Sequence, residues 1–213
     1  MSLDDYLTRM KPGQETINYL SADGRNAARH SPQLEGLAAH GVEVLLLHER
    51  IDEWAIGYLA EYEGRKLRNV AKGALGRAEL GEGGAGTEQQ EAIAKAAEGV
   101  VGKLAASLGE RVSEVRVSQR LTDSPACLVM GEHDMGLHMQ RLLKAAGHDV
   151  PAGKPALEIN PAHPLLQRYD TETDPARRDD LGLLLFEQAQ LAEGAALDDP
   201  AAFVRRMNAL LLG

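Results

Sequence analysis

The chain has 213 residues and a formal net charge of −9, from 23 basic and 32 acidic side chains. This length suits one large domain or two small ones. Neither residues 1–73 nor residues 74–213 have a basic excess, which argues against a nucleic-acid partner. A hydrophobic fraction of 44% excludes a wholly disordered chain, and no apolar run approaches the ~20 residues that cross a bilayer. The single cysteine, Cys127, cannot form an internal disulfide, so we expect a cytoplasmic protein without a membrane partner.

The first seventy residues alternate between helical and strand patterns. Strands separated by helices favour a small three-layer α/β unit with a largely parallel sheet. The unbroken apolar run at 42–48 predicts the central strand, covered on both faces. Glycines 41 and 64 are expected to end the two helices that they follow. In chain order we predict a helix at 2–11, a strand at 16–22, a helix at 26–40, a strand at 42–48, a helix at 52–62 and a short strand at 65–72.

A glycine-rich segment then interrupts the chain. Glycine recurs six times between residues 73 and 86, with almost no large apolar residue. Such a segment cannot build a core, so we predict a flexible linker at 73–87. This divides the chain into an α/β domain at 1–72 and a second domain at 88–213.

The second domain has an α+β pattern in which helices dominate the end. The alternation in VSEVRVSQ and the apolar ACLVM, separated by LTDSP, predict a β-hairpin. Two capped helices finish the chain. In order we predict a helix at 88–108, strands at 112–119 and 126–130, a helix at 134–146, a short strand at 157–160, a short helix after Pro164, and helices at 174–193 and 199–212.

Motifs of nucleotide, metal and redox enzymes are missing from the sequence. It contains no GxGxxG, GxxxxGK[ST], HExxH or CxxC. The seven histidines lack metal-ligand spacing, so we expect no metal site. An enzyme remains the alternative: a small α/β nucleotide-binding domain with an appended dimerisation module. It would require a phosphate loop after the strand at 16–22, where the sequence has only ADGRNAA.

Two apolar features have both a structural and a binding interpretation. Met135, Met139, Leu142 and Leu143 fall on one face of a predicted helix. Spacing alone favours a core face, although methionine also suits an adaptable surface for varied apolar partners. The lone tryptophan, Trp54, is interpreted first as a buried anchor.

The last forty residues carry more apolar surface than one helix hairpin can bury. Two copies related by a two-fold axis would bury it as an intermolecular four-helix bundle. The alternative is that the hairpin packs on its own domain. The residues predicted for the interface are Leu181, Leu184, Leu185, Leu191, Phe203, Met207, Leu210 and Leu211.

Taken together, these stretches resemble the C-terminal part of the heat-shock protein 90 chaperone family in its bacterial form. The similarity is collinear and covers nearly the whole chain, apart from the glycine-rich linker and residues around 170–180. The matching segments are SLDDYLTRMK at 2–11, GVEVLLLHERIDEWAIGYL at 41–59, RVSEVRVSQRLTDSPA at 111–126, the methionine helix at 133–143 and DPAAFVRRMNALLL at 199–212.

The resemblance implies a fragment: the end of the family's middle domain followed by its dimerisation domain. The ATP and Mg site of the family lies upstream, so the chain itself is expected to hold no cofactor and to be no enzyme. Its expected partners are a second copy and non-native client proteins.

The family's client-binding positions match six residues here. They are Glu53, Trp54, Met135, Met139, Leu142 and Leu143. Leu143 stands where an aromatic residue can occur. Gly136 is expected to weaken the helix by up to ~1 kcal/mol relative to alanine.

Overall fold

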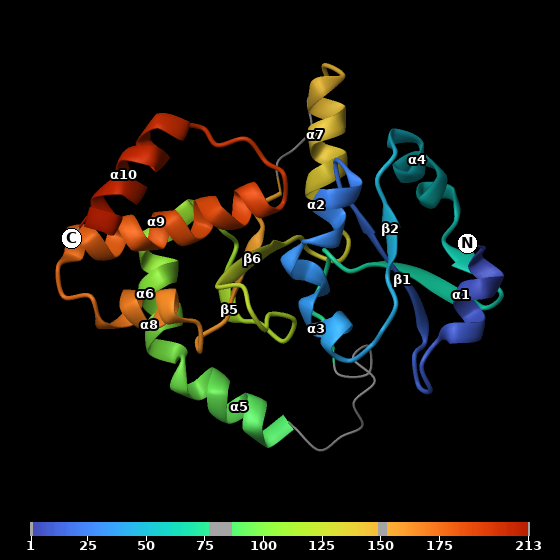
Figure 1. Cartoon of the computed structure of the whole chain (residues 1–213), viewed down its shortest axis with the longest axis horizontal. Coiled ribbons are helices and arrows are strands. Elements are labelled where there is room, and N and C mark those ends of the chain that lie inside the picture. The colour runs from blue at the N-terminus through green and yellow to red at the C-terminus, as the bar shows by residue number, and fades with distance from the viewer. Residues whose placement is uncertain (1, 77–86, 149–152, 213) are drawn as a thin grey trace.

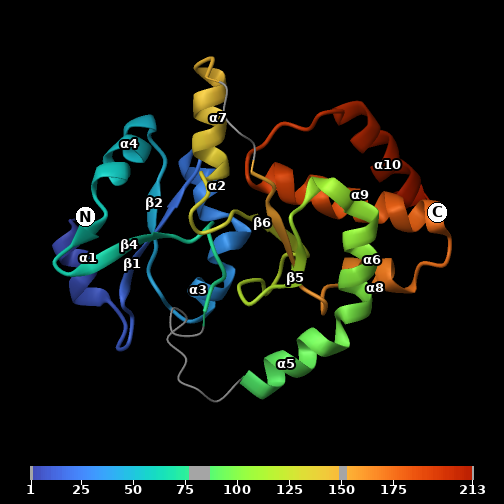
Figure 2. The same cartoon turned by 180° about the vertical axis from the view of Figure 1, so that it is seen from behind.

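The computed structural model describes residues 2–76, 87–148 and 153–212. Within these ranges, the side chains at positions 50, 53, 54, 87 and 89 lie outside the description. The fold is mixed, with two small sheets and helices around each. Figures 1 and 2 show two units side by side, with α7 between them and α5 extending away from the body. Among the described residues, no helix has the length and apolar content to cross a membrane.

The N-terminal unit is built on a four-stranded sheet in the order β2-β1-β4-β3. β1 pairs in parallel with both β2 and β4, and β3 pairs antiparallel with β4. Figure 1 shows α2 and α3 to one side of this sheet and α1 and α4 to the other. The elements are α1 (Leu3–Arg9), β1 (Thr16–Ser21), α2 (Arg25–Arg29), the 3-10 turn η1 (Pro32–Leu34), α3 (Glu35–Ala39), β2 (Leu45–Leu47), α4 (Arg50–Tyr58), β3 (Glu61–Tyr62) and β4 (Arg65–Asn69).

Three local predictions in this unit are wrong. The run at 42–48, predicted as the central strand, forms only the three-residue strand β2, which is half-buried and lies at the edge of the sheet. Val42 packs in the core before this strand begins. The helix predicted at 26–40 is divided at Pro32, which lacks an N–H and starts a new turn capped by Ser31. Gly64 ends no helix: with Glu63 it forms a two-residue turn, both residues at positive φ, between β3 and β4.

The C-terminal unit has a three-stranded sheet in the order β5-β7-β6, with α6, α8, α9 and α10 forming its core with the sheet. α9 contacts β6, α6, α8 and α10. The elements are α5 (Thr87–Ala96), α6 (Glu98–Leu108), the 3-10 turn η2 (Gly109–Arg111), β5 (Val115–Val117), β6 (Ala126–Val129), α7 (Leu137–Ala145), β7 (Ala156–Ile159), α8 (Pro164–Thr171), α9 (Pro175–Ala192) and α10 (Pro200–Leu212).

The predicted hairpin between β5 and β6 does not form. The two strands exist, but β7 lies between them, parallel to β5 and antiparallel to β6. All four residues of β7 are buried, so the strand predicted as a minor one is the centre of the sheet. The long helix predicted at 88–108 is two helices that meet at Ala97.

Each unit has its own hydrophobic core. The larger one belongs to the C-terminal sheet and helices. The smaller one belongs to the N-terminal unit and consists of Leu20, Leu37, Val42, Val70 and Leu75. Leu75 is only 3% exposed and belongs to this core, so the segment predicted as a flexible linker still packs on the N-terminal unit at Leu75. Residues 77–86 of that linker lie outside the described residues.

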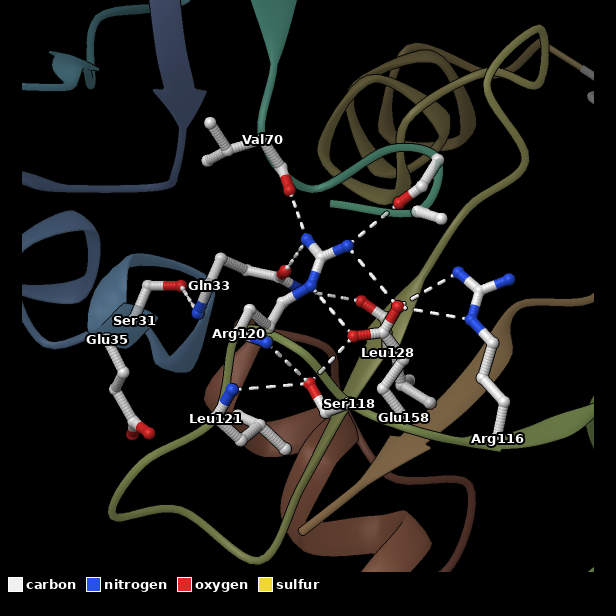
Figure 3. A network of polar contacts seen from close by, with 12 residues as sticks. Ser31, Gln33, Glu35, Val70, Arg116, Ser118, Arg120, Leu121, Leu128 and Glu158 are labelled. Atoms are coloured by element: carbon white, nitrogen blue, oxygen red, sulfur yellow. Dashed lines mark hydrogen bonds and ion pairs between the residues drawn. The ribbon is translucent and has the colours of Figure 1, made fainter. Parts of the chain in front are cut away.

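A buried arginine joins the two units. Arg120, which is 0% exposed, follows β5 in the C-terminal unit. Figure 3 shows its guanidinium between acceptors from both units. Its Nε donates to Glu158 Oε2 at 2.8 Å in β7, and its Nη1 donates to Gln33 Oε1 at 2.7 Å. The same group donates to the carbonyls of Val70 and Gly73, the latter at 2.8 Å.

The carboxylate that faces Arg120 is itself fully engaged. Glu158 is 3% exposed. It accepts hydrogen bonds from Arg116 Nη2 at 2.9 Å and from Ser118 Oγ at 2.8 Å. A buried ion pair is stable only when such additional hydrogen bonds satisfy both groups.

The start of α3 holds the loop that follows Arg120. Glu35 accepts hydrogen bonds from the backbone N–H groups of Thr122, Asp123 and Ser124, at 2.7, 2.9 and 3.1 Å. Burial favours a higher pKa for this carboxyl, but the hydrogen bonds from Ser124, Asp123 and Thr122 outweigh it, and the pKa is lowered from 4.5. Residues 121–125, predicted as a hairpin turn, are therefore an interdomain contact.

We predict that Arg120→Met lowers the free energy of unfolding by about 3–5 kcal/mol, because it leaves the Glu158 carboxylate buried without its main partner. Denaturant unfolding of the whole chain measures this change. The double variant Arg120→Met, Glu158→Met should recover part of the loss. A single-variant cost within ~0.5 kcal/mol, as at a surface site, would contradict the assigned role.

Glu35→Gln should lower the free energy of unfolding by about 1–2 kcal/mol at neutral pH, because neutral hydrogen bonds replace charged ones. The pKa of Glu35 is lower in the folded state, so its contribution is complete above the ordinary value of 4.5 and disappears as pH falls through the folded value. The gap between wild type and variant should therefore narrow in acid. Glu110→Gln, at a side chain 96% exposed, is the control and should change the free energy of unfolding by no more than about 0.5 kcal/mol at neutral pH.

Candidate functional site

The predicted methionine helix begins later than its sequence pattern suggests. α7 starts at Leu137 and Gly136 is its N-cap. The expectation that Gly136 weakens the helix from within is therefore wrong, and Met135 precedes the helix. The Nε2 atom of Gln140 donates to the Met135 carbonyl at 2.7 Å, which folds the preceding turn back onto the first turn of α7.

The apolar residues of this segment are partly accessible. Met135 is 39% exposed, and Met139, Leu142 and Leu143 are half-buried. Leu137, at the base of α7, packs against the C-terminal core. Figures 1 and 2 both show the rest of the helix projecting from the body of the molecule. The segment therefore offers an amphipathic helix attached mainly at its first turns.

The polar side of α7 contacts the N-terminal unit. His138 Nε2 lies 2.9 Å from Asp23 Oδ1, and Arg141 Nη2 lies 2.7 Å from Asp23 Oδ2. Arg141 also donates through Nη1 to the carbonyl of Glu193 at 2.6 Å, at the end of α9. Burial raises the pKa of Glu193 above 4.5, and a hydrogen bond from Gln33 opposes this shift.

The other two predicted client-binding residues lie on α4. Glu53 and Trp54 belong to the backbone of this helix, but their side chains lie outside the description. The same helix exposes Ile51 and Tyr58, by 65% and 90%. Figures 1 and 2 show α4 and α7 toward the same end of the molecule.

The terminal helix hairpin divides its apolar residues between the core and the surface. Four of the eight predicted interface residues face the chain's own core, each no more than 6% exposed: Leu181, Leu184, Leu185 and Leu210. Because they are already covered, these four leave almost no surface for a partner. Phe203 and Met207 are half-buried, whereas Leu191 is 45% and Leu211 74% exposed. Val204 and Leu212, not predicted for the interface, are 46% and 89% exposed.

The carboxyl end of β1 is where a doubly wound sheet would bind a nucleotide. Two cavities lie there, both lined by Ser21 and Glu193, and each holds about 20 Å³. A space of this size holds a single water molecule. The described residues therefore form no nucleotide cavity at this edge. No three His, Cys, Asp or Glu side chains within the described ranges gather as metal ligands.

The single cysteine lies inside the C-terminal sheet. Cys127 is 0% exposed in β6, and burial raises the pKa of its thiol well above 9.0. Its side chain packs in the interior, as its apolar sequence context predicts.

Comparison with known proteins identifies the family. The family model described as Hsp90 protein matches residues 1–212. The chain belongs to the Hsp90 protein family. It is 56% identical to the chaperone protein HtpG of Halorhodospira halophila over 213 residues and 56% identical to that of Alkalilimnicola ehrlichii over 211 residues. It is 51% identical to HtpG of Chromobacterium violaceum over 212 residues.

The match covers only part of each relative. It includes 99–100% of this chain but 32–33% of those HtpG proteins, so the chain spans about a third of their length. The resemblance on which the sequence analysis relied is thereby confirmed at the level of the family.

Sequence reasoning missed the polar residues that hold the site in place. Asp23 lies in the segment ADGRNAA, and His138 and Arg141 lie on the polar side of the methionine helix. Arg120 stands between the predicted strand at 112–119 and the predicted turn at 121–125. None of them has a local signal, because each partner lies far away in the sequence.

Proposed function

We propose that this chain is the dimerising and client-binding part of an ATP-dependent HtpG chaperone. On this proposal it corresponds to the C-terminal third of its relatives and acts in the cytoplasm. The proposal rests on one observation: a chain that matches this family keeps apolar side chains accessible on α10 and in the segment that includes α7. On this proposal, the nucleotide chemistry belongs to the rest of the full-length protein, since the chain spans about a third of its relatives' length.

The proposed dimer contact is the outer face of α10. Val204 and Leu211 are seven residues apart and so share one face of the helix, beside the half-buried Met207. Leu191, near the end of α9, is a further exposed apolar residue. A two-fold axis would place the same patch of both copies in contact and remove it from water. The buried leucines of α9 would support this surface from below.

The proposed client contact is the apolar side of α7. Met139 and Leu143 are four residues apart on the helix, with Leu142 beside them, and Met135 precedes the helix. Methionine is unbranched and polarisable, so such a surface adapts to varied apolar segments. Non-native proteins expose segments of this kind. The net charge of −9 would oppose non-specific aggregation through this surface.

The dimer proposal is tested by adding charge to α10. Val204→Glu with Leu211→Glu should convert the dimer to monomer, because association would bury unpaired carboxylates. Light scattering at micromolar concentration measures the mass. Ala209→Glu, exposed on the opposite side of α10, is the control and should remain dimeric. A Val204, Leu211 variant that stays dimeric would exclude this face.

The client proposal is tested on the two methionines. Met135→Asn with Met139→Asn should weaken binding of a chemically unfolded model protein at least tenfold, or about 1.4 kcal/mol. Full burial of such a side chain contributes about 1.5–3 kcal/mol, and a client would cover only the part of each methionine that is still exposed. Fluorescence anisotropy of the labelled model protein measures the affinity. Ile93→Asn on α5, at a residue 44% exposed, is the matched control and should bind normally. Equal affinities for all three proteins would count against the α7 surface.

A further inference from the structure

One carboxylate connects α7 to the N-terminal unit. Asp23 lies two residues after the end of β1, and its two oxygens contact different side chains of α7. Oδ1 lies 2.9 Å from His138 Nε2, and Oδ2 lies 2.7 Å from Arg141 Nη2. His138 and Arg141 are three residues apart, so they share one side of the helix. The contact is therefore two-pronged and fixes both the position and the rotation of α7.

The same arginine reaches a third segment. Arg141 Nη1 donates to the Glu193 carbonyl at 2.6 Å, where α9 ends. The next residue, Gly194, has a φ of +74°, and a Cβ atom there would come within 2.8 Å of Asp23 Oδ2. Glycine thus provides both the backbone conformation and the space for this contact. The loop after β1, helix α7 and the end of α9 therefore meet at one point.

The remaining attachment of α7 is limited. Leu137 enters the C-terminal core at the first turn. Gln140 is 6% exposed, and its side chain donates to the Met135 carbonyl just before the helix. The described residues after the last turn's leucines, 144–148, are all exposed. A helix of nine residues is too short to be stable without tertiary contacts. The contacts of His138 and Arg141 therefore have a large share in keeping α7 folded and in place.

We propose that Asp23 is a latch: it holds α7 against the N-terminal unit and so restrains the apolar side of α7 that is available to a client. With the latch closed, Met139, Leu142 and Leu143 stay half-buried. With it open, α7 can turn or move away and these side chains become more accessible. The restraint on α7 follows from the contacts alone, whereas its effect on clients rests on the proposed function.

Hydrogen exchange of the whole chain tests the latch. In Asp23→Ala, the backbone amides of residues 137–145 should exchange at least fivefold faster than in wild type. Asp170→Ala is the matched control: Asp170 is 50% exposed, against 49% for Asp23, and its ion pair with Lys103 has the same length of 2.7 Å. This control should leave α7 exchange unchanged. Unchanged exchange in Asp23→Ala would overturn the latch.

A variant at Arg141, on the α7 side of this ion pair, tests whether the effect of Asp23→Ala is confined to the loop around position 23. Arg141→Gln should also accelerate exchange of α7. Combining it with Asp23→Ala should accelerate exchange by less than the two separate effects together, because the two residues form one ion pair. Additive effects would overturn a shared contact.

Client affinity then tests the regulatory half of the proposal. Asp23→Ala should bind a chemically unfolded model protein several-fold more tightly than wild type. If Met135→Asn with Met139→Asn weakens binding but Asp23→Ala does not strengthen it, α7 is a client site that the latch does not regulate. If neither variant changes affinity while Asp23→Ala accelerates exchange, the latch exists and the client site proposed on α7 is wrong.

Discussion

The arrangement of the two units depends on the buried guanidinium of Arg120. Removing such a charge from water is expensive, and only a complete set of acceptors compensates for it. Here the acceptors come from both sides: Glu158 from the C-terminal sheet, and Gln33 with the carbonyls of Val70 and Gly73 from the N-terminal unit. The planar, forked donor pattern of arginine is satisfied in one geometry. The two separate hydrophobic cores are thus held in one relative orientation by polar contacts.

That orientation determines where α7 can be held. Gly36 donates its N–H to the Arg120 carbonyl at 2.7 Å, and a Cβ atom at Gly36 would lie 3.0 Å from that backbone. The close approach brings the N-terminal unit against β6, where Gln33 Nε2 donates to the Leu128 carbonyl at 2.7 Å. α7 follows β6 in the chain, so the loop after β1 comes within reach of it. The contact between Asp23 and α7 is a consequence of the Arg120 junction.

Sequence patterns predicted what depends on neighbours in the chain. Helices α9 and α10 lie within a residue or two of their predicted bounds, because their caps and apolar spacing are local. Strand order depends on distant residues: the hairpin prediction failed because β7, beginning at Ala156, enters between strands that end before Met130. For the same reason the sequence does not reveal that Arg120 meets Glu158, 38 positions away. Of the candidate site, the apolar residues were predictable and their polar supports were not.

α9 connects the two surfaces to which a function is proposed. Along its length it packs against α10, and its buried leucines belong to the C-terminal core. At its end, the backbone carbonyl of Glu193 accepts a hydrogen bond from Arg141 of α7, and its carboxyl group accepts one from Gln33 of the N-terminal unit. A close-packed helix moves as a rigid element, because a well-packed core resists small deformations. On the proposed function, a displacement of α10 in a dimer would reach the base of α7 through α9, and the proposed contact of Asp23 with Arg141 is the one that would receive it.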